Sequence, residues 1–272
     1  HAPIFLGEGF MKCIVCVKQV PDTANVEVDP VTGVLKRDGT QSKLNPYDLY
    51  AMESALGMKE QQGGTVDVIT MGPGQAREAL KECMCMGADR AGLISDRKFA
   101  GADVVATSYT LSQGIRRMGE YDLILCGKQT TDGDTAQVGP EVAQWLGIPH
   151  ASNVLEIRET GEGRIRVRMN MDGYEQIQTM DLPCLITMDK DVNTPRLPSY
   201  KREKELREGY LREFSLTDLE DRDESHYGLS GSPTQVERIF PPEKGECREM
   251  FDGSPDVLAH RMYHVLRETK FL

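Results

Sequence analysis

The 272-residue sequence has no apolar run long enough to cross a membrane, and it has no excess of positive charge. Its formal net charge is −11, which argues against general nucleic-acid binding. The sequence therefore predicts neither membrane insertion nor a nucleic-acid partner. Residues 1–10 also lack the charged start and apolar centre of a signal peptide, and we expect them to be an added remnant or an alternative start.

The cysteines do not form an even set. There are seven, which fits a reducing, cytoplasmic compartment better than a disulfide framework. Cys13 and Cys16 form a C-x-x-C, but they lie in a strand-like run where positions three apart point to opposite faces. We therefore interpret them as core residues and predict no metal site.

Both common phosphate-binding motifs are missing. No glycine precedes Gly127 and Lys128 at the spacing of a Walker A loop, and Gln129 stands where Ser or Thr is required. The run Gly72-Pro73-Gly74 lacks the third glycine of a dinucleotide fingerprint. An ATP-using enzyme of the adenine-nucleotide-binding α/β kind stays a weak alternative, because no phosphate-activating motif is recognisable.

A strand, a long polar loop and a helix follow one another in residues 121–147. Residues 123–126 are a short apolar run, and helical apolar spacing begins near Gln137. This order presents backbone N–H groups at a helix N-terminus, which suits a phosphate or pyrophosphate. Polar side chains that could assist are Lys128, Gln129, Thr130, Thr131, Thr135 and Gln137. The alternative is an ordinary strand-to-helix connection rich in turn formers.

Strands and helices alternate over the first two-thirds of the chain. Strands are predicted at 13–17, 66–71, 91–94 and 123–126, with helices between them; the first helix has Asn45 as its cap and Pro46 in its first turn. This indicates an α/β fold: a doubly wound, Rossmann-like parallel sheet covered on both faces. Ligands bind such sheets at the carboxyl ends of the strands, where loops 18–22, 72–74, 95–101 and 127–137 lie.

The pattern changes after residue 147. Strands at 154–157, 165–169, 174–180 and 185–188, with turns at 161–163 and 172–173, predict a C-terminal β-hairpin region. We expect a nucleotide-binding domain over 11–199, followed by an extended C-terminal arm and helix over 200–272 that contact a partner subunit. The last helix starts at Ser254 and Pro255, and its apolar residues share one face: Leu258, Met262, Val265 and Leu266.

Several long stretches resemble the beta subunit of electron-transfer flavoproteins. They are VCVKQVPDT (15–23), LNPYDLYAMESAL (44–56), TMGP (70–73), MGADRAGLISD (86–96), LILCGKQTTDGDTAQVGPE (123–141), LPCLITM (182–188), NTPRLPS (193–199) and GSPTQV (231–236). The resemblance implies a heterodimer with an alpha subunit that carries an electron-transferring FAD. It also implies an adenine nucleotide on this chain, with contacts carried over to Cys16, Asn45, Met71, Gly72, Gly127, Lys128, Gln129, Thr135, Ala136, Gln137 and Val138.

Ordinary members hold AMP as a structural ligand, and members that bifurcate electrons from NADH hold a second FAD. The small, open loop 132–136, the run 20–22 and the sequence around Asp103, Thr107 and Ser108 resemble the FAD-binding kind. We therefore expect FAD, with Thr130 and Asp134 also at the site, NADH as the donor and ferredoxin or flavodoxin as a low-potential acceptor. The cofactor would carry the chemistry of this NADH-dependent oxidoreductase complex, so no residue is predicted to be catalytic.

One segment departs from the family pattern. Tyr200 stands where the family usually has a leucine that anchors acyl-CoA dehydrogenases, and Glu203 and Glu205 interrupt the basic run that follows. The partner expected from this is a flavin dehydrogenase of the acyl-CoA or 2-hydroxy acid type. Tyr200 is predicted to lie on a surface loop and to anchor that partner, with packing on its own domain as the alternative.

Overall fold

The computed structural model describes residues 10–22, 27–28, 35–36, 42–207, 209–237 and 249–271. The chain divides into two compact units, His1–Glu237 and Arg238–Leu272, and each is described by itself. Within the described residues, every helix is too short or too polar to cross a membrane. The expected remnant falls largely on residues 1–9, which lie outside the described residues, as do 238–248 of the expected arm.

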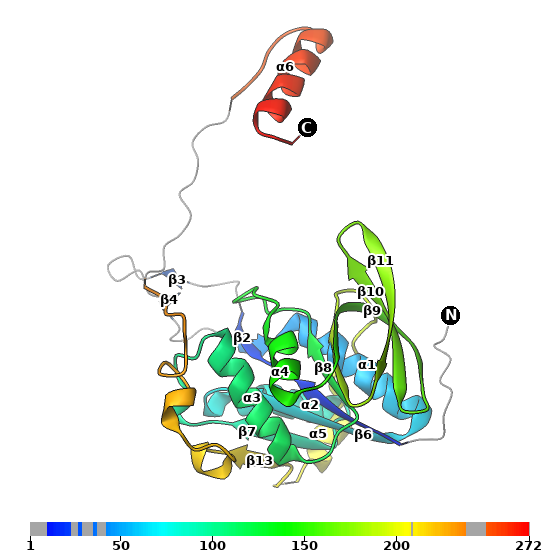
Figure 1. Ribbon diagram of the computed structural model, residues 1–272, viewed down its shortest axis with the longest axis vertical. Helices are drawn as coiled ribbons and strands as arrows, with labels where there is room; N and C mark the ends of the chain where they lie inside the picture. Colours follow the sequence, from blue (N-terminus) through cyan, green and yellow to red (C-terminus); the bar gives the residue numbers. More distant parts are fainter. Residues whose placement is uncertain are drawn as a thin grey trace. The chain divides into compact units, whose positions relative to one another are not determined.

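A nine-stranded, mostly parallel sheet forms the centre of the first unit (Figure 1). Its spatial order is β11-β10-β9-β12-β8-β1-β6-β7-β13. The bounds are β1 Met11–Cys16, β6 Gly64–Met71, β7 Arg90–Ile94, β8 Leu123–Gly127, β9 His150–Gly161, β10 Arg164–Met171, β11 Tyr174–Asp181, β12 Cys184–Met188 and β13 Leu211–Phe214. Two small antiparallel ribbons pair β2 (Gln19–Pro21) with β5 (Ser42–Leu44), and β3 (Glu27–Val28) with β4 (Leu35–Lys36).

Helices cover both faces of this sheet, which confirms the predicted α/β, doubly wound fold. Their bounds are α1 Pro46–Gln62, α2 Arg77–Met86, α3 Val104–Met118, α4 Val138–Leu146 and α5 Tyr200–Glu205. Apolar residues of α1 and α2 pack in one core cluster with Val15 of β1, and those of α3 and α4 pack in another with Ile14. Successive residues of β1 therefore serve opposite faces, as a buried parallel strand requires.

The same alternation determines on which face of the sheet each cysteine of the C-x-x-C lies. Cys13 packs in the first cluster and Cys16 in the second, so the two thiols lie on opposite faces of the sheet. All six cysteines among the described residues are free and buried. The prediction that these cysteines are core residues is confirmed.

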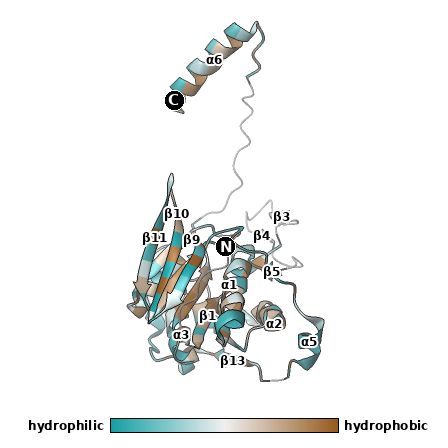
Figure 2. Cartoon of the chain, turned by 90° about the vertical axis from the view of Figure 1, so that its right-hand side faces the viewer, coloured by the Kyte–Doolittle hydropathy of each residue, from teal (hydrophilic) through white to brown (hydrophobic). Residues whose placement is uncertain are grey.

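The hairpins after residue 147 are confirmed, and they continue the main sheet. β9, β10 and β11 are antiparallel neighbours, while β12 inserts between β9 and β8 and runs parallel to both. Figure 2 shows hydrophilic and hydrophobic bands alternating along β9–β11. Buried and exposed residues alternate along β10 in the same way, which is typical of a sheet with one face covered.

The expected boundary at residue 199 differs from the structure. β13 adds to the sheet as a parallel neighbour of β7, and the first unit continues to Glu237. Phe214 and Tyr227 lie in the core of this unit. Phe214 is the only buried residue of β13, so the mixed-charge sequence around it carries almost no strand pattern.

The described part of the second unit contains α6, Pro255–Glu268. The helix starts at the predicted Ser254 and Pro255, and none of its residues is buried. Among the described residues of this unit, the apolar face of α6 is therefore not buried.

Candidate functional site

The carboxyl ends of β8, β1 and β6 meet at one edge of the sheet (Figure 1). Cys16 is in register with Cys126 on one side and Ile69 on the other. Gly127 and Met71 therefore end the two strands beside Cys16. This brings together the predicted residues Cys16, Met71, Gly72 and Gly127, which are far apart in the sequence.

Asn45 joins the start of α1 to the loop after β8. It occupies the N-cap position as predicted, but its side chain makes no cap hydrogen bond. Instead, its amide Nδ2 donates to the carbonyl of Gln129 at 2.9 Å, and its Oδ1 accepts from the N–H of Thr131 at 3.3 Å. The side chain is fully buried. Asn45 therefore positions the loop after β8, and the predicted capping role was wrong.

A buried carboxyl that the sequence analysis missed lies under this edge. Asp48 accepts from the N–H of Lys18 at 2.7 Å and from the N–H of Gly127. Burial raises the pKa of Asp48 to about 7. A Cβ atom at Gly127 would come within 2.4 Å of Asp48 Oδ1, so only glycine lets the strand end approach α1 this closely. The only signal in the sequence was an acid in the first turn of the helix, three residues after Asn45.

The loop after β8 exposes its backbone next to the start of α4. Asp134 and Ala136 adopt left-handed conformations, with φ of 54° and 57°. The N–H of Asp134 donates to Thr130 O at 3.0 Å, and the amide of Gln129 donates to the Asp134 carboxylate. Residues 131–137 are exposed, and no side chain caps α4 at Gln137. An uncapped helix N-terminus beside an exposed loop suits an anion.

The lysines at this edge already have carboxylate partners. Lys128 Nζ lies 3.4 Å from Asp189, and Lys18 Nζ lies 2.8 Å from Asp132. The positive charge of Lys128, predicted for a phosphate, is thus shared with Asp189. A bound phosphate would rely mainly on backbone N–H groups and the α4 dipole.

The residues predicted at the start of α3 have structural partners. The Asp103 carboxylate accepts from the N–H of Ala106 at 3.0 Å, and from the N–H and hydroxyl of Thr234 at 2.9 and 2.7 Å. The N–H of Thr107 donates to Asp103 O at 2.9 Å. Asp103 thus caps α3 and holds the segment around Thr234.

Ser108 links α3 to α4. Its buried hydroxyl donates to Glu141 Oε2 at 2.9 Å and accepts from Trp145 Nε1 at 3.1 Å. The second turn of α3 is therefore hydrogen-bonded to two successive turns of α4. Val138 is half-buried in the first turn of α4 and packs on the second core cluster. Glu141 and Trp145 were not predicted at this junction.

A cavity of about 290 Å³ adjoins the α3–α4 junction. It is lined by Val105, Ala106, Tyr109, Trp145, Ser225, His226 and Gly231. The Tyr109 hydroxyl and His226 Nδ1 each lie 2.6 Å from Asp221 Oδ2. Burial by itself raises the pKa of Asp221, but hydrogen bonds from Tyr109, the Asp223 N–H and His226 lower it to about 2. The sequence analysis missed this cluster because Tyr109 is more than 100 positions away from Asp221 and His226.

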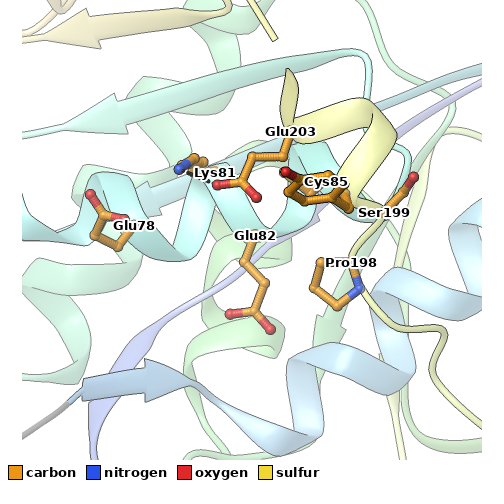
Figure 3. Close-up of a pocket in the computed structure, with 8 residues that line it drawn as sticks. Glu78, Lys81, Glu82, Cys85, Pro198, Ser199 and Glu203 are labelled. Carbon is orange, nitrogen blue, oxygen red and sulfur yellow. Dashed lines mark hydrogen bonds and ion pairs between the residues drawn. The ribbon is translucent and has the colours of Figure 1, made fainter. Parts of the chain in front are cut away.

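A second hollow of about 270 Å³ lies between α2 and the segment that leads into α5 (Figure 3). Lys81 and Glu203 point toward one another there and form an ion pair at 2.8 Å. Tyr200, which lines the hollow, is 69% exposed and is the first residue of α5, so the predicted loop is a short helix. Leu197, which the sequence analysis passed over, is 88% exposed nearby in the chain.

The sequence of this chain matches a known protein family over most of its length. The model of the electron transfer flavoprotein domain matches residues 32–218. The chain belongs to the electron transfer flavoprotein family. It is 41% identical to the electron transfer flavoprotein subunit beta of Clostridium acetobutylicum, over 96% of this chain and 100% of that protein. This agreement along the whole length identifies it as a member of the beta-subunit type.

Two further relatives have other names. Subunit CarD of the caffeyl-CoA reductase-Etf complex of Acetobacterium woodii is 47% identical over 90% of this chain and 93% of its own length. Protein FixA of Bradyrhizobium diazoefficiens is 43% identical over 90% of this chain and 87% of its own length. Relatives with three different names are thus similar to this chain over 90% or more of its length.

Proposed function

We propose that this chain is the beta subunit of an electron-bifurcating flavoprotein and holds FAD at the carboxyl edge of its sheet. NADH is the donor, and the electrons leave for the FAD of an alpha subunit and for ferredoxin or flavodoxin. The observation that carries the proposal is the uncapped start of α4, which stands beside the exposed loop 131–137 and the converging ends of β8, β1 and β6.

The residues at this edge fit the adenosine and phosphate portion of FAD. Backbone N–H groups at a helix start are suited to phosphate oxygens, and the left-handed Ala136 keeps its side chain small where the loop turns. FAD, when bound, supplies hydride acceptance and one-electron transfer. AMP shares the adenosine and phosphate groups, so it is the competing occupant of the same edge.

This chain's own residues bind and orient. Asn45 and Asp48 fix the loop after β8 and the end of β8, and Gly127 permits their close approach. Asp103 fixes the start of α3. Such preorganisation is the contribution expected of a protein whose cofactor carries the reaction. No acid, base or nucleophile from this chain is required.

The partner dehydrogenase is proposed to dock at Leu197 and Tyr200. Both side chains are exposed: Leu197 lies on the segment that joins β12 to α5, and Tyr200 is the first residue of α5. Tyrosine is among the residues that are enriched at the hot spots of interfaces. The name of the Acetobacterium relative places it with a caffeyl-CoA reductase. This supports a flavin dehydrogenase of the acyl-CoA type as the partner, with the 2-hydroxy acid type as its alternative.

The test is the nucleotide content of the complex with its alpha subunit. Denaturation followed by chromatography should release two FAD per heterodimer and no AMP. One FAD and one AMP would contradict bifurcation and assign this chain an AMP-holding, structural role. A single FAD per heterodimer and no AMP would mean that this chain holds no nucleotide.

A further inference from the structure

Two histidines lie one turn apart on α6, at positions 260 and 264. Their Nε2 atoms are 3.3 Å apart, and their ring centroids are 4.7 Å apart. Residues four apart on a helix are neighbours on its surface, so both rings reach the same point in space. We propose that His260 and His264 form a two-ligand site for a divalent transition-metal ion such as Zn²⁺ or Ni²⁺.

The separation of the two nitrogens suits a single ion. Zinc binds histidine nitrogen at about 2.0–2.1 Å, and two such bonds at a tetrahedral angle place the nitrogens roughly 3.4 Å apart. The spacing in α6 is close to that value without any change of backbone. The i, i+4 pair on one helix face is also the arrangement by which helices present two histidines to zinc.

The site has two protein ligands and leaves other positions to water. Among the residues that the structure describes, no group of three or more His, Cys, Asp or Glu side chains could hold a metal. Zinc sites that are not closed by protein ligands hold water or a further ligand at the open position. Imidazole nitrogen suits Zn²⁺, Ni²⁺ and Cu²⁺ and suits Mg²⁺ or Ca²⁺ poorly, which sets the metal class.

The histidines lie on the opposite side of α6 from its apolar stripe. At 3.6 residues per turn, Leu258, Met262 and Val265 share one side, and positions 260 and 264 fall roughly half a turn away. A surface that covers only the apolar stripe therefore leaves the histidine pair in contact with solvent. Metal binding and docking of the apolar stripe are separate properties of the helix.

A bound ion would join two successive turns of α6. Because the ion binds the helical form and not the unfolded segment, it stabilises the helix by a factor that rises with metal concentration. At nine times the dissociation constant, local opening of α6 should become about tenfold rarer. This gives a readout that does not depend on electron transfer.

The experiment titrates the full chain with Zn²⁺ by isothermal calorimetry and follows α6 by hydrogen exchange. Wild type should bind one ion. In His260→Asn and in His264→Asn, the affinity for this ion should be at least tenfold weaker. The double variant Arg261→His/His264→Arg swaps two residues, so it keeps the composition but places the histidines at adjacent positions, 260 and 261. It should also lose the site. His150→Asn, on β9, is the matched control and should bind as wild type does.

Hydrogen exchange separates this site from zinc bound elsewhere on the chain. Zn²⁺ should slow exchange in peptides covering 255–268 in wild type and in His150→Asn, and EDTA should reverse the effect. Equal binding by wild type and all variants would overturn the proposal. Loss in only one of the two single variants would overturn it as well, because a chelate requires both nitrogens.

Discussion

At the scale of single residues, Asp48 couples the candidate site to pH. Burial raises its pKa from 3.8 to about 7, so between these values the folded chain binds a proton that the unfolded chain has lost. The free energy of unfolding therefore falls as pH rises from about 4 to 7. The loss of stability that comes from ionising the buried Asp48 is absent below this pH range and complete above it. It amounts to at most about 4 kcal/mol.

Replacing Asp48 by Asn should flatten this pH dependence. The amide does not titrate, so the unfolding free energy measured with urea at pH 4.5, 5.5, 6.5 and 7.5 should lose the slope contributed by Asp48. Asp172→Asn, in the exposed turn between β10 and β11, is the control and should keep the wild-type slope. An unchanged slope in Asp48→Asn would mean that Asp48 stays ionised in the folded chain throughout this range.

A second residue-scale prediction concerns Ala136. Its left-handed backbone lies in the exposed loop beside the start of α4, so Ala136→Arg would fill the proposed nucleotide site with a long side chain. FAD content of the heterodimer should fall from two to one, while the far-ultraviolet circular dichroism stays that of wild type. Ala136→Gly, which relieves the strain and adds no bulk, should keep both flavins. Full flavin content in Ala136→Arg would place the nucleotide elsewhere.

Single-residue roles were the hardest to predict from sequence. Asn45 was recognised as a helix start, but its hydrogen bonds to residues 129 and 131 depend on where β8 ends beside β1. Leu197 was passed over because exposure of an apolar side chain cannot be derived from its own segment. Both roles are set by contacts between distant parts of the chain, which local patterns do not encode.

At the scale of elements, one carboxylate holds both the start of α3 and the segment around Thr234. Asp103→Ala would remove the cap at Ala106 and the two bonds from Thr234 together. We expect the free energy of unfolding to fall by about 1–2 kcal/mol. Asp103→Asn keeps an acceptor and should cost less, while Thr234→Val tests the segment alone. Urea denaturation of the three variants measures this, and equal stability of Asp103→Ala and wild type would contradict it.

Most elements were predictable because their apolar periodicity is strong. The strands predicted at 13–17, 66–71, 91–94 and 123–126 match β1, β6, β7 and β8 within a few residues, and the helices predicted between them are α1, α2 and α3. The neighbours of β12 and the presence of β13 were not predictable. Strand order is decided by which edges are free when the chain folds, and β13 contributes a single buried residue.

At the scale of the whole molecule, Leu197 and Tyr200 form the proposed contact with a partner dehydrogenase. Leu197→Ala and Tyr200→Ala should each weaken the affinity for the partner dehydrogenase roughly thirtyfold, which corresponds to about 2 kcal/mol. Electron delivery to the partner should fall with this affinity. Reduction of the complex by NADH should stay at the wild-type rate, because the flavin sites are unchanged. The measurement compares delivery with NADH reduction for each variant.

The control for docking is Tyr174→Ala on β11, an exposed tyrosine outside residues 197–200. It should leave the rates of electron delivery and of NADH reduction unchanged. Loss of delivery and reduction together in Tyr200→Ala would indicate general damage. Loss of neither in both Leu197→Ala and Tyr200→Ala would remove this segment from the interface.

The position of β12 has a consequence for synthesis on the ribosome. β8 and β9 precede β12 in the chain, yet β12 separates them in the sheet. Until residue 188 has emerged, both strands keep an open edge, and β7 waits for β13, about 120 positions later. Open parallel edges invite pairing with other chains. A nascent chain stalled before β12 should therefore need a holding chaperone. A chain released after residue 237 contains all nine strands and can pair the open edges of β7, β8 and β9 itself.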